Sequence, residues 1–296
     1  MPLPDPANEA IADFMRREKL GSEFTETVAR IYRPLAIRIE TLARARRGLV
    51  VGFCGSQGSG KSTGVGVLRL LLEAMGLRIA TLSIDDLYLP KEARQKLAEE
   101  VHPLLATRGP PGTHDVALGE RLLEMLFKSQ VTAIPRFDKS LDTRADPSQW
   151  EQFQGPADVI LFEGWCVGAK PEPLQALVDP INELERSSDP DGRWRRYVNY
   201  ALAGPYQQLF ARIRFLAFLQ APSFEVVASW RKEQEAKLRA RMGESSGVMS
   251  DTQIDRFVQF YERLTRFLLA EMPSRADAMV QLGPHREPLE LDIHIR

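Results

Sequence analysis

The chain has 296 residues, of which 39 are basic and 40 acidic, so its formal net charge is -1. This balance gives no electrostatic reason to expect nucleic acid or an anionic membrane as a partner, and it favours small-molecule chemistry. The two cysteines, Cys54 and Cys166, suit a reducing compartment and form neither a disulfide framework nor a metal-binding spacing. Because no run of about 18 apolar residues and no secretory signal is present, the sequence predicts a soluble cytoplasmic protein.

The first part of the chain is expected to be helical. Residues 8–46 carry apolar side chains at helical spacing, for example Ile31, Leu35 and Ile39. We interpret residues 1–47 as a helical extension whose apolar positions serve packing.

A phosphate-binding loop follows. A short apolar strand, residues 49–53, leads into Gly-Phe-Cys-Gly-Ser-Gln-Gly-Ser-Gly-Lys-Ser-Thr at positions 52–63 and then into a helix, residues 61–75. This order fits the pattern G-x-x-x-x-G-K-[ST] in its required setting, in which backbone N–H groups and the helix dipole face phosphate oxygens. Lys61 is expected to reach the β- and γ-phosphates, and the Ser62 hydroxyl to bind Mg²⁺. The predicted nucleotide-binding residues of the loop are Gly55, Ser56, Gln57, Gly58, Ser59, Gly60, Lys61, Ser62 and Thr63.

Two carboxylates follow the next strand. Asp85 and Asp86 come directly after the strand predicted at residues 78–84. Ligands of an open parallel sheet collect at the carboxyl ends of its strands, so we expect both near the γ-phosphate. One could accept the proton of an acceptor hydroxyl while the other holds Mg²⁺ through water. The alternative is capping of the helix that follows, at residues 91–100.

The next loop concentrates polar groups. It contains Arg-Gly-Pro-Pro-Gly-Thr-His-Asp at positions 108–115. Turn formation explains the glycines and prolines but not a cation, a hydroxyl, an imidazole and a carboxylate within eight residues. Arg108 is a candidate for bidentate pairing with a substrate carboxylate, and Thr113, His114 and Asp115 are candidates for hydrogen bonds to substrate hydroxyls. For His114, a packed or capping role is the alternative.

Two cationic side chains follow the end of a further predicted strand. After a helix at residues 116–128, a strand at 131–135 is followed by Arg136 and Lys139, for which substrate contacts are expected. An internal salt-bridge network is the alternative.

The strand at residues 158–162 ends in a carboxylate, as a Walker B strand does. Since a phosphate loop requires such a partner, Glu163 is expected to order the Mg²⁺ shell. The candidate Mg²⁺ site thus comprises Ser62, Asp85 and Glu163.

The last third of the chain alternates between polar and apolar segments. Residues 171–192 are rich in Pro, Asp, Glu and Ser, which favours a surface excursion. Residues 213–220 form a near-continuous apolar run, typical of a strand covered on both faces. Ser250 and Gln253 predict a capping box for a long helix that ends at Pro273.

A charged helix at residues 223–242 is followed by residues 243–247, expected to be mobile. Together they predict a helical lid, about residues 223–249, with Arg231 as its nucleotide-binding cation. An exposed charged face is the alternative.

This alternation of strands and helices predicts an α/β fold. The phosphate loop specifies it as a P-loop NTPase with three α/β/α layers, a mainly parallel five-stranded sheet and right-handed crossovers.

Five motifs together resemble the D-glycerate 3-kinase family, which belongs to the phosphoribulokinase, uridine kinase and pantothenate kinase group of P-loop kinases. They lie at positions 52–63, 84–89, 108–115, 135–140 and 162–165. The resemblance extends from about residue 48 to the C-terminal strand, so residues 48–296 are interpreted as the P-loop kinase domain. It implies that Asp85, the first acid of the family's Asp-x-[Phe/Leu/Tyr]-Tyr motif, is the candidate base. Leu87, where an aromatic residue is commoner, departs from the pattern, as does the long segment 171–192.

The resemblance implies an ATP:D-glycerate 3-phosphotransferase that uses ATP and Mg²⁺ and makes 3-phosphoglycerate by in-line attack on the γ-phosphate. Its catalytic residues would be Lys61, Asp85, Asp86 and Glu163. One alternative is a kinase of the same group that acts on another hydroxylated metabolite, such as a nucleoside or pantothenate. The other is an NTP-dependent regulatory or assembly module, against which the acceptor-like cations Arg108 and Arg136 argue.

Overall fold

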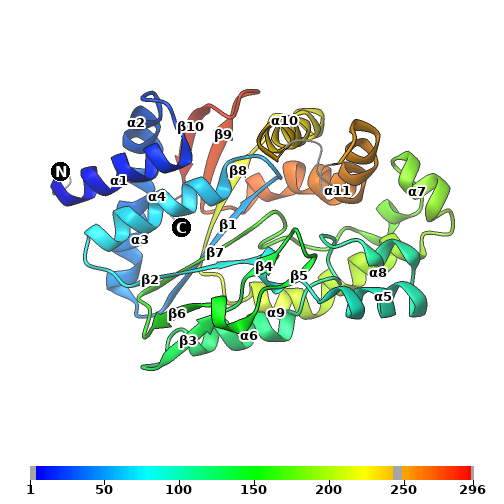
Figure 1. The fold of residues 1–296 in the computed structure, drawn as a ribbon, viewed down its shortest axis with the longest axis horizontal. Helices are drawn as coiled ribbons and strands as arrows, with labels where there is room; N and C mark the ends of the chain where they lie inside the picture. Colours follow the sequence, from blue (N-terminus) through cyan, green and yellow to red (C-terminus); the bar gives the residue numbers. More distant parts are fainter. Residues whose placement is uncertain (1–4, 243–248, 295–296) are drawn as a thin grey trace.

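A central twisted sheet with helices on both faces forms the body of the protein (Figure 1). The computed structural model describes residues 5–242 and 249–294. The sheet has six strands in the order β10-β9-β8-β1-β7-β2. Their bounds are Leu49–Gly55 (β1), Ile79–Ser83 (β2), Val159–Gly164 (β7), Phe215–Gln220 (β8), Ala278–Leu282 (β9) and Pro288–Ile293 (β10). Every neighbouring pair is parallel except β9 with β10, which confirms the mainly parallel P-loop fold.

The helices divide into two groups by the face of the sheet that they cover (Figure 1). The hydrophobic core on one face of the sheet includes residues of α1 (Asp5–Glu18), α3 (Arg33–Ala45), α4 (Lys61–Ala74) and α10 (Phe224–Met242). The core on the other face includes residues of α6 (Val116–Met125), α8 (Arg193–Ala201) and α9 (Gln207–Phe210). Both cores include residues of α11 (Asp251–Glu271), whose start has the predicted Ser250–Gln253 capping box. The remaining α-helices of the described ranges are α2 (Phe24–Thr27), α5 (Lys91–Glu100) and α7 (Glu183–Ser188). None of the helices in the described ranges has the length and apolar character needed to span a bilayer.

The strand expected at residues 131–135 lies outside the main sheet, which is a correction to the sequence prediction. Strand β3 (Val131–Ile134) pairs antiparallel with β6 (Glu151–Gln154), and β9 provides the fifth parallel strand instead. The connection from β3 to β6 contains the small β4 (Phe137–Asp138) and β5 (Thr143–Arg144) pair and a short 3₁₀ helix (Pro147–Gln149), but no α-helix. Because a parallel connection usually needs a crossover helix, this segment closes as an antiparallel pair.

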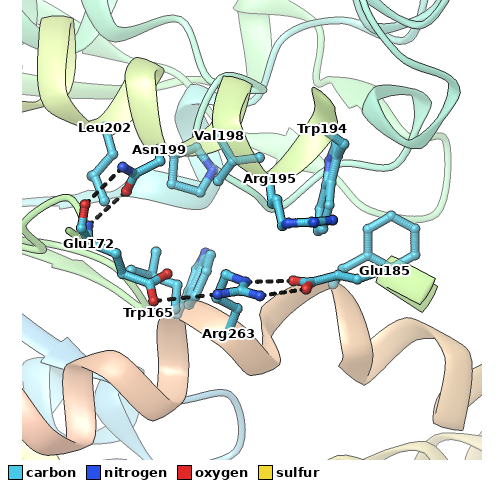
Figure 2. A pocket seen from close by; sticks show the side chains of 12 residues that line it. Trp165, Glu172, Glu185, Trp194, Arg195, Val198, Asn199, Leu202 and Arg263 are labelled. Carbon is cyan, nitrogen blue, oxygen red and sulfur yellow. Dashed lines mark hydrogen bonds and ion pairs between the residues drawn. The ribbon is translucent and has the colours of Figure 1, made fainter. Parts of the chain in front are cut away.

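Part of the 171–192 segment is interior rather than a surface excursion. Glu185 is fully buried, and Arg263 of α11 donates to both of its carboxylate oxygens at 2.7 Å. Figure 2 shows Arg263 between Glu185 and Glu172, whose Oε2 lies 3.8 Å from its Nη1. Burial raises the pKa of Glu172 to about 7, against the attraction of Arg263, and nearby Glu185 adds to the increase. The polar composition of the segment is used to build a buried ion cluster, which composition alone does not distinguish from a solvated loop.

Candidate active site

The phosphate loop joins β1 to α4 at the carboxyl end of the sheet. Gly60, the N-cap of α4, has φ +86°, and Gly58 has φ +76°. Residues with a side chain rarely adopt this left-handed backbone. A Cβ atom on Gly58 would also lie 2.9 Å from the Cβ of Trp230 on α10. The loop's glycines are therefore needed both for its curvature and for the close approach of α10.

The structure brings the Walker A hydroxyl and the Walker B carboxylate together. The Oγ atom of Ser62 donates to Oε1 of Glu163 at 3.1 Å, and the Nζ atom of Lys61 lies 3.3 Å from the Ser56 carbonyl oxygen. Hydroxyl and carboxylate oxygens suit Mg²⁺, which is usually held by one or two carboxylates together with substrate phosphates and water. Within residues 5–242 and 249–294, no cluster of three or more His, Cys, Asp or Glu side chains could hold a metal by itself. A magnesium ion at Ser62 and Glu163 would therefore need phosphate oxygens to complete its shell.

Asp85 lies one strand away from this pair. Glu163 is in register with Ser83 on β2, and Asp85 follows two residues later. Its side chain, 29% exposed, accepts hydrogen bonds from Lys139 Nζ at 2.6 Å and from the Tyr88 hydroxyl at 2.8 Å. Burial alone would raise the pKa of Asp85, but Lys139 and the more distant Lys61 outweigh it and hold the pKa below its usual range. Asp85 is thus an ionised carboxylate whose counter-ion, Lys139, is exposed to solvent.

Asp86 has a different environment. Its two oxygens accept hydrogen bonds from Arg136 Nη1 at 2.9 Å and from the backbone N–H of Phe137 at 3.0 Å. Burial raises the pKa of Asp86 and Asp85 adds to the rise, while Arg136 opposes it. Arg136 also pairs with Glu151. These contacts anchor the β3–β4 connection to the 3₁₀ segment that follows β2, so both Asp86 and Arg136 have partners within the protein.

Side chains of the 108–115 loop itself stabilise its conformation through hydrogen bonds. The Thr113 hydroxyl is fully buried, donates to the Pro110 carbonyl at 2.8 Å and accepts from the Gly109 N–H at 3.0 Å. Asp115 caps α6 through the Leu118 N–H and pairs with Arg144 at 3.0 Å. Thr113 and Asp115 therefore shape the loop, and their predicted contacts with substrate hydroxyls stay a prediction.

His114 is a packed histidine. Its ring stacks on Tyr88 with centroids 4.6 Å apart, and Nδ1 lies 2.6 Å from the Tyr206 hydroxyl. Burial lowers the pKa of His114 to about 4, so the ring is neutral at pH 7. Its Nε2 atom is buried with no hydrogen-bond partner among the described residues.

Arg108 lies at the open side of the loop. Its guanidinium pairs with Asp142 and lies 5.6 Å from the centroid of the Phe137 ring. Asp142 sits in the turn between β4 and β5 with φ +55°, close to Lys139, whose carbonyl oxygen is 3.4 Å from Arg108 Nη2. Two of the three cations predicted for substrate contacts, Arg108 and Lys139, thus lie at the same small hairpin, whereas Arg136 pairs with Asp86 and Glu151.

Comparison with known proteins assigns the family. No protein-family model matches the chain. It is 33% identical over 261 residues to an uncharacterized kinase of Schizosaccharomyces pombe, covering 83% of this chain and 88% of that protein. It is 34% identical over 266 residues to the chloroplastic D-glycerate 3-kinase of Arabidopsis thaliana, covering 81% of this chain and 54% of that longer protein. The chain belongs to the D-glycerate 3-kinase family. The structure of a D-glycerate 3-kinase from Cryptococcus neoformans superposes with a TM-score of 0.72 at 27% identity, covering 92% of this chain and 99% of that chain.

Membership of the D-glycerate 3-kinase family makes the chain a phosphotransferase of the P-loop kinase fold that uses ATP. The lid role expected of α10 stays a prediction. Arg231 on α10 donates to Glu235 at 2.7 Å and lies 5.4 Å from the ring centroid of Phe257. A role for Arg231 over the phosphates stays a prediction, and residues 243–247, expected to be mobile, lie outside the described residues.

Sequence reasoning missed a tyrosine that links the loops of this kinase. The Tyr261 hydroxyl donates to the carbonyl oxygen of Arg108 at 3.1 Å, and a Cβ atom on Gly109 would lie 2.0 Å from it. Burial raises the pKa of Tyr261, which a hydrogen bond with Gln57 opposes. Tyr261 is one of the buried residues of α11, and no local sequence signal shows that its hydroxyl joins the phosphate loop to the 108–115 loop.

Proposed function

We propose that this chain transfers the γ-phosphate of ATP to the 3-hydroxyl of D-glycerate, giving 3-phosphoglycerate. The observation that carries the proposal is the position of Asp85. An ionised carboxylate lies one strand from the Ser62–Glu163 pair and is bonded to Lys139 of the β4–β5 hairpin. Arg108 pairs with Asp142 of the same hairpin. An acceptor hydroxyl at Asp85 would therefore have a base beside it. The γ-phosphate of the nucleotide would lie on one side of this hydroxyl, and Lys139 and Arg108 on the other.

In this proposal Asp85 takes the proton as the acceptor oxygen attacks phosphorus. Lys61 neutralises charge that develops on the transferring group, and Mg²⁺, when bound at Ser62 and Glu163, orients the phosphates and screens their charge. The exposed Lys139, 60% accessible, can leave Asp85 as the acceptor enters.

The acceptor's carboxylate is assigned to Arg108. A guanidinium matches a carboxylate with two parallel hydrogen bonds, and the present partner of Arg108, Asp142, shows that the site already accommodates a carboxylate. The unpartnered Nε2 of His114 is a second candidate contact, since buried polar atoms are rarely left without a hydrogen bond.

An acceptor panel tests the proposal. With ATP and Mg²⁺, D-glycerate should be phosphorylated at the 3-position, as phosphorus NMR of the product would show. Glycerol, which lacks the carboxylate, and uridine and pantothenate serve as comparisons. Equal use of glycerol and D-glycerate, or a clear preference for uridine or pantothenate, would refute the acceptor assignment and leave a small-molecule kinase of another specificity.

A further inference from the structure

The guanidinium assigned to the acceptor carboxylate, that of Arg108, has a second cation behind it. Arg94 of α5 is 1% exposed. Its Nη2 atom donates to the carbonyl oxygen of Asp142 at 3.1 Å and lies 2.7 Å from the side-chain Oδ2 of the same residue. The other side-chain oxygen of Asp142, Oδ1, pairs with Nη1 of Arg108. One carboxylate thus bridges a buried guanidinium and a guanidinium at the open side of the 108–115 loop.

Asp142 is anchored at both its backbone and its side chain. Its φ of +55° lies in the left-handed region, which Asp and Asn tolerate better than most residues with a side chain. Arg94 is itself fixed, because it also donates to the carbonyl oxygens of Leu89 and Ala106. Burial would raise the pKa of Asp142, but Arg94 and Arg108 outweigh it and hold the pKa below its usual range. An incoming acceptor therefore meets an ionised carboxylate that is tied to the interior by Arg94.

Arg108 keeps N–H groups for a ligand while it is paired with Asp142. A guanidinium has five N–H donors, and Asp142 is bound through Nη1. The Nη2 atom lies 3.4 Å from the Lys139 carbonyl oxygen, which is long for a hydrogen bond. The Arg108 side chain is 26% exposed, so an acceptor can approach these donors. Its pairing with Asp142 and binding of an acceptor carboxylate are thus compatible.

Packing connects this guanidinium to the proposed base. Arg108 lies over the Phe137 ring, and that ring packs edge-on against Tyr88 with centroids 5.1 Å apart. The Tyr88 hydroxyl in turn donates to Asp85 at 2.8 Å. A carboxylate held by Arg108 would therefore have a defined position relative to the base. A small displacement of the guanidinium would move the acceptor hydroxyl away from Asp85, and such displacements are costly for catalysis.

We propose that Asp142, anchored by Arg94, is a positioning residue that fixes the Arg108 guanidinium for the acceptor carboxylate. The inference rests on the proposed function, because it takes Arg108 as the ligand of that carboxylate. Two cations and one anion leave a single positive charge in this group, which a single acceptor carboxylate would neutralise. Without Asp142, the two guanidinium groups would repel each other, and the exposed Arg108 would turn away from the buried Arg94.

Asp142→Asn tests this bridge with little change to the backbone. Asn also tolerates a positive φ, but its amide offers one acceptor oxygen where the carboxylate offers two. The buried Arg94 should keep that oxygen, and the more exposed Arg108 should be released.

The matched control is Asp138→Asn in the same hairpin. The Oδ1 atom of Asp138 accepts from the backbone N–H groups of Ser140 at 2.8 Å and Leu141 at 3.1 Å. This carboxylate therefore supports the turn itself, whereas that of Asp142 binds Arg108. The two substitutions change the same chemical group in the same hairpin and differ in the partner that is lost.

A double-mutant cycle with Arg108→Ala separates positioning from general support of the fold. The measured quantities are kcat/KM for D-glycerate and KM for ATP, in both the wild-type and the Arg108→Ala background. We expect Asp142→Asn to lower kcat/KM for D-glycerate by about 10- to 100-fold at an unchanged KM for ATP. In the Arg108→Ala background the same substitution should cost at most about twofold. Asp138→Asn should have an equal effect in both backgrounds.

Three results would overturn the inference and leave the proposed kinase intact. They are an unchanged kcat/KM for D-glycerate in Asp142→Asn, an equal loss in both backgrounds, and a gain, which would show that Asp142 competes with the acceptor for Arg108. If the wild type does not phosphorylate D-glycerate, the proposed function and the inference both fail. Should thermal melting show that Asp142→Asn does not fold, Asp142→Gly replaces it with the same expectations, because Gly adopts a positive φ without strain.

Discussion

The two neighbouring aspartates provide a sharp test of the mechanism, because their environments predict opposite responses to the same substitution. In Asp85→Asn the proposed base loses its ability to take a proton, while its shape is kept. In Asp86→Asn the change falls on a carboxylate whose oxygens are already used by Arg136 and Phe137. One variant should therefore lose turnover, and the other should lose stability.

The magnitude for Asp85→Asn follows from its contacts. General-base catalysis contributes about 10²- to 10⁴-fold, which is about 3 to 5.5 kcal/mol of activation free energy. The partner cation Lys139 is 60% exposed, so loss of the pair should cost at most about 1 kcal/mol of folding stability. We expect kcat to fall by at least about 100-fold, with the KM for ATP and the melting temperature little changed.

For Asp86→Asn the larger effect should be on unfolding. The Asp86 side chain is 13% exposed, and breaking a buried ion pair costs about 3–5 kcal/mol. Arg136 keeps Glu151 and is itself 34% exposed, so we expect about 1–3 kcal/mol. In domains of roughly 150–250 residues, each kcal/mol lowers Tm by about 2–4 °C.

The assays are steady-state kinetics at saturating ATP and D-glycerate, and calorimetric melting of each variant. Asp85→Asn with kcat within about threefold of the wild type would refute its role as the base. A larger loss of kcat in Asp86→Asn at an unchanged Tm would transfer that role to Asp86.

Three further predictions concern single residues. Lys61→Ala should abolish phosphoryl transfer and leave the melting temperature unchanged, because the cation acts on the transferring phosphate; near-normal turnover would refute the phosphate-loop mechanism. Arg108→Lys should weaken D-glycerate use by roughly 2–5 kcal/mol in kcat/KM, since Lys lacks the planar fork, and should barely change ATP binding; titration of both substrates checks this. Glu172→Gln should become more stable relative to the wild type as pH rises. The pKa of Glu172 in the folded protein, about 7, lies above its unfolded value. The wild type therefore loses about 3 kcal/mol of its free energy of unfolding between pH 4.5 and 7. Urea unfolding at pH 5 and pH 8 measures the difference. Glu183→Gln serves as the control, because the Glu183 side chain is 70% exposed. If the stability of the wild type does not fall over this interval relative to Glu172→Gln, the raised pKa of a buried Glu172 carboxyl group is contradicted.

The parts of the fold that could be predicted are those specified by neighbouring residues. The strand, loop and helix around Lys61 follow from glycine geometry and apolar periodicity, and the end of β7 marks Glu163 as its partner. The Ser62 hydroxyl donates to Glu163 in the structure, and the role of this pair in binding Mg²⁺ stays a prediction.

The parts that could not be predicted depend on contacts between distant segments. Arg94 looks like one more charged residue of a helix, yet it is 1% exposed and donates to the carbonyl oxygens of Leu89, Ala106 and Asp142. No sequence pattern around Arg286 indicates a structural role, although its side chain donates a hydrogen bond to the phosphate loop. Such bonds depend on where the backbone of another segment passes, and backbone carbonyls carry no sequence signature.

The central position of β1 has a consequence for how the protein is made. Both neighbours of β1 come more than 100 residues later, since Leu49 pairs with Val159 and Val51 with Phe215. At about 5–20 residues per second, a ribosome needs on the order of ten seconds to supply them. During that time an uncharged apolar segment with two unpaired edges is exposed to other nascent chains. The yield of active protein should therefore depend on the supply of chaperones during translation. A lower growth temperature of the expressing cells should increase this yield.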